Sequence, residues 1–352
     1  GIPYAVVKVG WLIGVLYIVC LGLLIMGLNL MLGEITLRTK EPLQLAGLAG
    51  RYLGRRGKTI MATTSLFSSF GALLAYLIGE GVILQSLLGG SLLFWSLIFW
   101  AIASFFVFLG LSIVKKADIL LTLIILGIVL AISFLSAPQI KLPHLSTTSL
   151  NNILLPFGVI LFALQGASAI PQVKEILPAS QKRMKTAIIT ASLIIIGAYL
   201  LFMTAVLGVT GQATTEVATI GLGKKLGNGV LILASVFGLF TMGTCFLNVA
   251  LAIKRVFIWD FKISRFKAWL ITVGVPLILF LAGIRSFIKT IDFIGSLFGS
   301  LTAIFVISIY WRAKQKGDLT PHRYKLHHTL LLSVLIIIIF LIASLYNLFA
   351  KL

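Results

Sequence analysis

The chain of 352 residues is 59% hydrophobic and only 11% charged, whereas about 25% of the residues in a typical soluble domain are charged. So few charges could not cover a soluble protein of this size, and so much apolar content excludes intrinsic disorder. The 29 basic and 9 acidic residues give a net charge of +20. They stand in short clusters between apolar runs, so they indicate membrane topology and no nucleic-acid partner. The sequence therefore predicts an all-α, polytopic membrane protein.

Ten apolar runs approach the length of about 20 residues that crosses a lipid bilayer. The residues that precede them, 1–9, are expected to be the outer remnant of an earlier, truncated helix. We expect residues 1–352 to form a single transmembrane domain. The ten runs cover residues 11–32, 60–88, 92–114, 119–135, 150–170, 186–208, 230–253, 268–282, 293–311 and 330–349.

The basic residues give this set of helices an orientation. If residues 1–9 rise to the outer side, the loops predicted on the inner side hold 22 of the 29 Lys and Arg residues, and seven remain outside. Loops rich in Lys and Arg stay in the cytoplasm. We therefore predict a multi-pass protein of the cell (plasma or inner) membrane whose Lys/Arg-rich loops are cytoplasmic.

The first of these inner loops, residues 38–58, carries a helical pattern. Leu45, Leu48 and Tyr52 fall at helical spacing, and Pro42 suits the start of a helix. We predict a short amphipathic helix that lies on the cytoplasmic face. The alternative is a solvated linker.

Two segments look like broken helices, which a bilayer tolerates only around a cavity. The first is Gly1-Ile2-Pro3-Tyr4-Ala5, and the second runs from Gln165 to Pro171 inside an apolar run. Each has Ile-Pro after small residues, and they lie in the first and sixth helix positions. A five-plus-five inverted repeat gives this placement, and its freed backbone groups bind substrate and ion. The alternative is a pair of ordinary proline kinks.

Four stretches of the sequence resemble motifs of the aromatic and hydroxy amino-acid permease family. That family belongs to the amino acid/auxin permease group of the amino acid-polyamine-organocation superfamily. The matching stretches are Gly1-Ile2-Pro3-Tyr4-Ala5, Arg51-Tyr52-Leu53-Gly54, Phe162 to Pro171, and Thr244 to Leu251. The resemblance runs from end to end, and the order and spacing of the motifs carry it. Lys254 and Arg255 depart from the family, which often has an acidic residue there.

The resemblance implies a leucine-transporter-like fold, with a five-plus-five inverted repeat, an eleventh helix and a first helix that is truncated here. It also implies a secondary active transporter, a symporter that moves aromatic or other neutral amino acids by alternating access. The substrate would bind at the two breaks, and no cofactor other than a proton or sodium gradient is expected. The candidate substrate-binding residues are Gly1, Ile2, Pro3, Tyr76, Phe162, Gln165, Gly166, Ala167 and Ser168.

Ion coupling has two sets of candidates. Glu80 is the only carboxylate that we place well inside a span, where a buried acid favours its neutral form and can carry a proton. Alternatively, Glu80 reaches water at the outer end of its helix. Thr241 and Thr244 share a face of the eighth helix and could bind sodium, or could simply bond back to their own helix. For Glu34, near a membrane end beside basic residues, we expect an interfacial ion pair.

Other function classes fit less well. A membrane-embedded enzyme would need a catalytic set inside the bilayer, and one isolated Glu without a buried His argues against it. No spacing of His, Cys or acidic residues indicates a metal site. The sequence leaves open a sensor that binds an amino acid without moving it, a sodium-coupled permease of the same fold, and the oligomeric state. The expected partners are an amino-acid substrate and the lipid bilayer.

Overall fold

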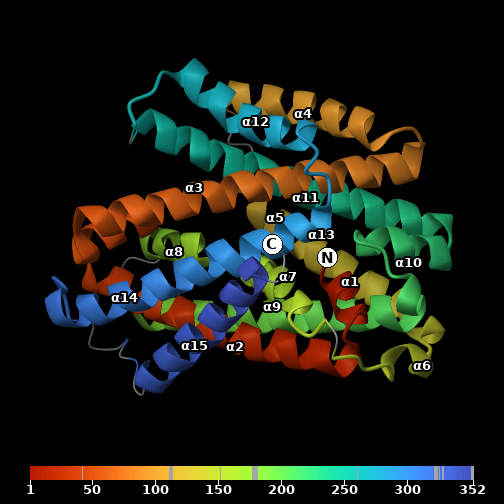
Figure 1. Ribbon diagram of the computed structural model, residues 1–352, viewed down its shortest axis with the longest axis horizontal. Coiled ribbons are helices and arrows are strands. Elements are labelled where there is room, and N and C mark those ends of the chain that lie inside the picture. Colours follow the sequence, from red (N-terminus) through yellow and green to blue (C-terminus); the bar gives the residue numbers. More distant parts are fainter. Residues whose placement is uncertain are drawn as a thin grey trace. The chain divides into compact units, whose positions relative to one another are not determined.

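The computed structural model describes residues 1–41, 43–110, 114–150, 152–176, 181–259, 261–320, 324, 326 and 329–349 (Figure 1). The chain divides into two compact units. Unit 1 comprises Gly1–Gly14, Ser69–Leu155 and Ala198–Ile291, and unit 2 comprises Val15–Ser68, Pro156–Gly197 and Asp292–Leu352.

Nearly all of the regular structure in the described residues is helical. Five helices contribute residues to both units: α2 (Trp11–Arg38), α3 (Leu45–Leu88), α7 (Leu155–Leu164), α9 (Gln181–Thr210) and α13 (Phe287–Phe293). Unit 1 also contains α1 (Ile2–Val7), α4 (Leu92–Leu109), α5 (Val114–Ser136), α6 (Leu142–Leu145), α10 (Ala218–Leu226), α11 (Asn228–Trp259) and α12 (Arg265–Leu281). The helix α13 (Phe287–Phe293) continues through a π-helical segment, η4 (Ile294–Gly299), into α14 (Ser300–Lys316). Unit 2 further contains α8 (Ile170–Ile176), α15 (Thr329–Phe349) and all of α7 except Leu155.

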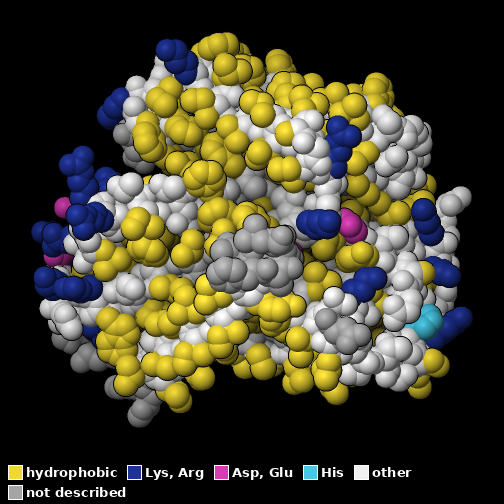
Figure 2. Space-filling view, in the orientation of Figure 1, with side chains coloured by type: hydrophobic (Ala, Val, Ile, Leu, Met, Phe, Trp, Pro, Cys, Tyr) yellow, Lys and Arg dark blue, Asp and Glu magenta, His cyan; other side chains and the backbone are white. Residues whose placement is uncertain are grey.

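Each of the ten predicted runs coincides with helix. Within the described residues, eight helices are long and apolar enough to cross a membrane. The other two runs are α12, with 17 residues, and the run over 150–170, which is broken. The protein is a multi-pass membrane protein, and most of its large exposed hydrophobic side chains lie on helices long and apolar enough to cross a membrane. Figure 2 shows hydrophobic side chains over much of one face.

The helix α10 was not predicted, because its nine residues lie in a loop between two long apolar runs. Ala218 and Leu222 of α10 are buried with Val206 of α9, Ile132 of α5 and Ala234 of α11. These contacts make α10 part of the core of unit 1, whereas its own sequence is too short and too polar to signal a span.

The side chain of Lys254, which departs from the family pattern, caps the C-terminal end of α4 in unit 1. Its Nζ atom donates hydrogen bonds to the carbonyl oxygens of Val107, at 2.7 Å, and Phe108, at 3.1 Å. Both carbonyls belong to the last turn of α4, where backbone acceptors have no partner within the helix. A cation at this end also interacts favourably with the helix dipole.

The predicted short helix of the first inner loop is present at the start of α3. Leu48 and Tyr52 are buried, and a break follows at Gly54, where φ is 77° and ψ is −170°. Only glycine adopts this backbone conformation readily. A Cβ atom at Gly57 would lie 2.5 Å from the Cβ atom of Leu53, so the chain turns tightly after the break.

Candidate functional site

The predicted break in the sixth helix position is confirmed in unit 2. Helix α7 ends at Leu164, Gly166 has φ −144° and ψ 8°, and a 3₁₀ turn over Ala167–Ala169 precedes α8. The interruption of the α-helical hydrogen-bond ladder therefore falls inside an apolar run. Spanning helices are interrupted in this way around binding sites.

The residues at this break differ in exposure. The side chains of Gln165 and Ser168 are exposed, whereas Phe162, Gly166 and Ala167 are half-buried. A Cβ atom at Gly166 would meet nothing within 4 Å. The break thus presents two polar side chains and accessible backbone, as expected for a site that holds a small polar molecule.

The two Ile-Pro pairs both stand at the start of a helix. Ile2 and Pro3 begin α1 in unit 1, and Ile170 and Pro171 begin α8 in unit 2. Proline suits the first turn because it has no backbone N–H to leave unsatisfied. Gly1 precedes α1 directly and accepts a hydrogen bond from the backbone N–H of Ala5 at 3.1 Å. The expectation that the Gly1 segment adjoins the second break stays a prediction.

In unit 1, the structure brings together Tyr76, Glu80 and the threonine-bearing helix α11. The side chains of Tyr76 and Cys245 are hydrogen-bonded. A Cβ atom at Gly243 would lie 3.3 Å from Oε1 of Glu80, and one at Gly238 would lie 2.6 Å from Cδ1 of Ile83. Residue numbers rise along α3 as they fall along α11, so the two helices pack antiparallel.

Glu80 is buried, with 1% of its surface exposed. The alternative in which it reaches water at a helix end is therefore not what the structure shows. Among the described residues, its Oε1 atom has no hydrogen-bond partner. An acid buried with one oxygen atom unpartnered is costly, so Glu80 is a candidate for a functional role.

The two threonines of α11 bond back to their own helix. The hydroxyl of Thr241 donates to the carbonyl oxygen of Phe237 at 2.6 Å, and that of Thr244 donates to Phe240 at 2.8 Å. This is the ordinary behaviour of threonine within a spanning helix. These contacts therefore give no particular support to a sodium site.

Sequence reasoning missed a second deeply buried acid. Asp292 is fully buried, and the span that contains it runs over Phe287–Lys316. The expectation that Glu80 is the only carboxylate well inside a span is therefore wrong. The predicted run began at residue 293, since the mixed polar sequence before it lowers the local hydropathy.

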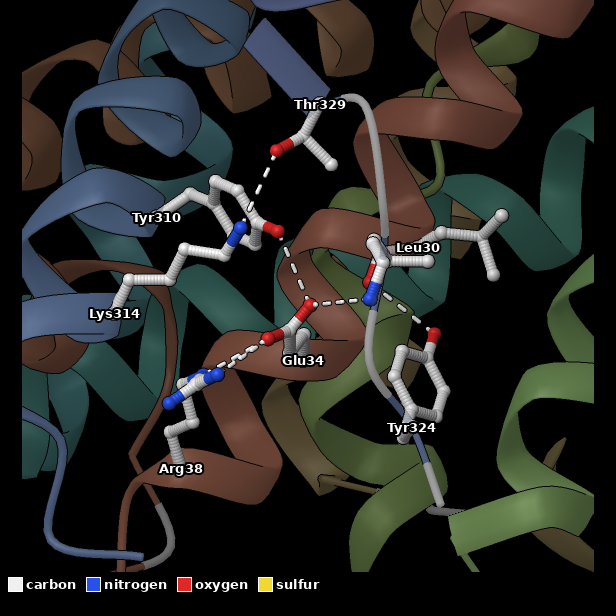
Figure 3. A network of polar contacts seen from close by, with 8 residues as sticks. Leu30, Glu34, Arg38, Tyr310, Lys314, Tyr324 and Thr329 are labelled. Carbon is white, nitrogen blue, oxygen red and sulfur yellow. Dashed lines mark hydrogen bonds and ion pairs between the residues drawn. The ribbon is translucent and has the colours of Figure 1, made fainter. Parts of the chain in front are cut away.

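The predicted ion pair of Glu34 is confirmed, but the group is buried and not interfacial. Oε1 of Glu34 accepts hydrogen bonds from Nε and Nη2 of Arg38 at 2.9 and 2.7 Å. Oε2 accepts from the hydroxyl of Tyr310 at 3.1 Å and from the backbone N–H of Leu326 at 3.2 Å. Figure 3 shows Glu34 at the centre of these contacts, which join α2, α14 and the segment before α15 in unit 2.

The described residues contain no group of three or more His, Cys, Asp or Glu side chains that could hold a metal ion. The groups that the structure brings together are hydrogen-bonding groups at a helix break and buried acids. Such groups bind and release a ligand or a proton.

Solved structures of membrane transporters share this fold. The structure of MhsT in complex with L-phenylalanine has a TM-score of 0.66 and 14% identity, over 100% of this chain and 94% of that one. The inward-facing structure of Mhp1 has a TM-score of 0.60 and 15% identity, over 98% and 85%. A manganese transporter from Eremococcus coleocola has a TM-score of 0.64 and 17% identity, over 99% and 85%. These likenesses show a leucine-transporter-like fold, which the broken helix in unit 2 fits.

Within this fold class, the chain belongs to the tryptophan/tyrosine permease family, whose sequence profile matches residues 1–346. It is 25% identical over 301 residues to the tyrosine-specific transport system 1 of Haemophilus influenzae, covering 78% of this chain and 74% of the relative. It is 26% identical over 332 residues to transport system 2 of the same organism, covering 84% and 80%. The predicted resemblance, fold class and transporter function are confirmed, and the sensor alternative is not favoured.

Proposed function

We propose that this permease carries tyrosine or tryptophan into the cell together with a proton. The substrate class rests on the family and on relatives described as tyrosine-specific transport systems. The inward direction follows from coupling to a proton that enters the cell down its gradient. Because the substrate is an amino acid, its binding site must satisfy a carboxylate and an ammonium group.

The observation that carries the proposal is the helix break between Leu164 and Ile170. Backbone groups released from the helical ladder can bind the charged ends of the amino acid. The exposed side chains of Gln165 and Ser168 supply further hydrogen-bonding groups, and the half-buried Phe162 supplies an aromatic surface.

Glu80 is our candidate for the proton carrier. Its burial against α11 disfavours the charged form, so the group loses its proton only when water or a cation reaches it. Alternating access provides such a change, because the surroundings of a buried group differ between the two states. The side chain of Tyr76, one helical turn earlier, lies on the same face of α3.

The substrate site is tested by binding of labelled tyrosine to the purified protein. Gly166→Leu should abolish binding without preventing folding, because a Cβ atom at Gly166 meets nothing within 4 Å. The matched control is Gly197→Leu on α9, another glycine with open space around its Cβ position. Retained binding in Gly166→Leu would show that the substrate does not use this break.

The coupling ion is tested separately in proteoliposomes. Glu80→Gln should remove tyrosine uptake driven by a pH gradient and leave tyrosine exchange largely intact, because exchange needs no net proton movement. Thr241→Val, which keeps the shape of the side chain, should leave proton-driven uptake unchanged. Uptake that follows a sodium gradient at fixed pH and survives Glu80→Gln would overturn the proton assignment.

A further inference from the structure

The π-helical segment η4 lies directly against the broken helix in unit 2. It forms the middle of the span Phe287–Lys316. Segments of π-helix inside spanning helices are frequent at functional positions. Gly295 and Gly299 stand four residues apart on η4, and both face α7. Small residues at this spacing allow two spanning helices to approach closely.

The first of these glycines makes a backbone contact. A Cβ atom at Gly295 would overlap the carbonyl oxygen of Gly158 and would lie 2.8 Å from the backbone nitrogen of Phe162. In the opposite direction, a Cβ atom at Gly158 would overlap the carboxylate of Asp292. The two helix backbones therefore leave no room for a side chain here, and Gly295 has a structural role.

Gly299 makes a different kind of contact. A Cβ atom there would lie 2.5 Å from Nε2 of Gln165 and 3.1 Å from Cγ of Leu161. The nearest atom is the end of a flexible side chain, which can move, and not backbone. Because Gly299 has no side chain, the amide of Gln165 can lie directly beside η4. Gln165 is the residue at which α7 breaks.

We propose that Gly299 is a positioning residue, which places the amide of Gln165 for hydrogen bonding to the amino-acid substrate. This inference rests on the proposed substrate site at the break in α7. An alanine at position 299 would displace the amide by roughly 1 Å, the difference between 2.5 Å and an ordinary contact of about 3.5 Å. A displacement of this size breaks a hydrogen bond to a bound ligand, because such bonds weaken steeply with misalignment.

The experiment measures the affinity of the purified full-length chain for labelled tyrosine, together with its thermal midpoint. Gly299→Ala should weaken binding about ten-fold, which is the loss of roughly one hydrogen bond, with little change in the thermal midpoint. Gln165→Ala should weaken binding to a similar extent. In the Gln165→Ala background, Gly299→Ala should have no further effect, because the amide that it displaces is already absent. Gly197→Ala serves as the control glycine substitution and should change neither quantity.

Gln165→Asn provides a second test that does not depend on the folding of a glycine variant. Its amide is one methylene shorter and cannot occupy the place beside Gly299, and the side chain is exposed. It should also weaken binding about ten-fold. Unchanged affinity in Gln165→Asn, or an equal effect of Gly299→Ala in both backgrounds, would overturn the role of Gly299. Unchanged affinity in Gln165→Ala would instead overturn the proposed role of Gln165 in the substrate site.

Discussion

Replacing Glu34 by glutamine removes one charge from the buried network of unit 2 and keeps the shape of the side chain. The glutamine oxygen can still accept from the hydroxyl of Tyr310 and the N–H of Leu326. Its NH₂ group would then face the guanidinium of Arg38, where two donors meet without an acceptor. Because Glu34 is fully buried, water cannot replace the lost carboxylate.

The expected cost follows from the burial of the partner that remains. Removing one member of a buried ion pair destabilises a protein by about 3–5 kcal/mol. We expect the lower end, about 3 kcal/mol, because the Arg38 side chain is 11% exposed and its long stem can carry the guanidinium toward water. Adding Arg38→Met removes the unpaired charge, so the double variant should recover most of the lost free energy of unfolding.

The assay is denaturant unfolding of the detergent-solubilised protein at pH 7, and the control is Asp318→Asn. Asp318 pairs with Arg51 at 2.5 Å, but both side chains are partly exposed. The backbone N–H of Lys40 and the guanidinium of Arg51 lower the pKa of Asp318. Its pair is therefore complete at pH 7 and is lost only as the pH falls through that lowered value. The control should have little effect. A Glu34→Gln variant as stable as the control would refute the reasoning.

Three further predictions concern the elements around the site. Lys174→Met removes a 2.6 Å hydrogen bond from Nζ to the carbonyl oxygen of Thr39. The substitution should lower the free energy of unfolding by about 1 kcal/mol. An unchanged midpoint of unfolding in urea would contradict this. Gly54→Ala should cost about 1–3 kcal/mol through backbone strain alone, since a Cβ atom there meets nothing within 4 Å; the same titration measures it. A cysteine at position 147 should react with a membrane-impermeant reagent from outside intact cells, whereas one at position 54 should not; the reverse pattern would contradict the orientation.

The sequence was sufficient for the spanning helices and for the position of the break. A bilayer demands long apolar runs and a closed backbone hydrogen-bond ladder, so Gly166 near the end of such a run, with Pro171 directly after it, indicates a break. The burial of Glu80 was one of two alternatives that the sequence left open, because Glu80 stands only eight residues from the end of its predicted run; the packing against α11 decides between them. Local composition thus indicates the spans and the break, but not the burial of Glu80.

The rest depends on contacts between segments that are far apart in the chain. Nothing in the residues around Glu34 indicates that Tyr310 and Leu326 donate to its carboxylate. The π-helical turn before Ser300 also could not be predicted from the local sequence, because it needs only small residues and a closely packed neighbouring helix. Asp292 was missed for a simpler reason, since hydropathy alone placed the start of its helix too late.

The partners of the buried Glu34 carboxylate are synthesised at very different times. Tyr310, one of its donors, follows 276 residues later in the chain. At a synthesis rate of about 5–20 residues per second, Tyr310 is therefore synthesised roughly 15–55 s after Glu34. Arg38 is made four residues after Glu34 and lies on the same helix face. The nascent helix can therefore enter the membrane as a neutralised pair, and the later donors reach an acceptor that is already held in place.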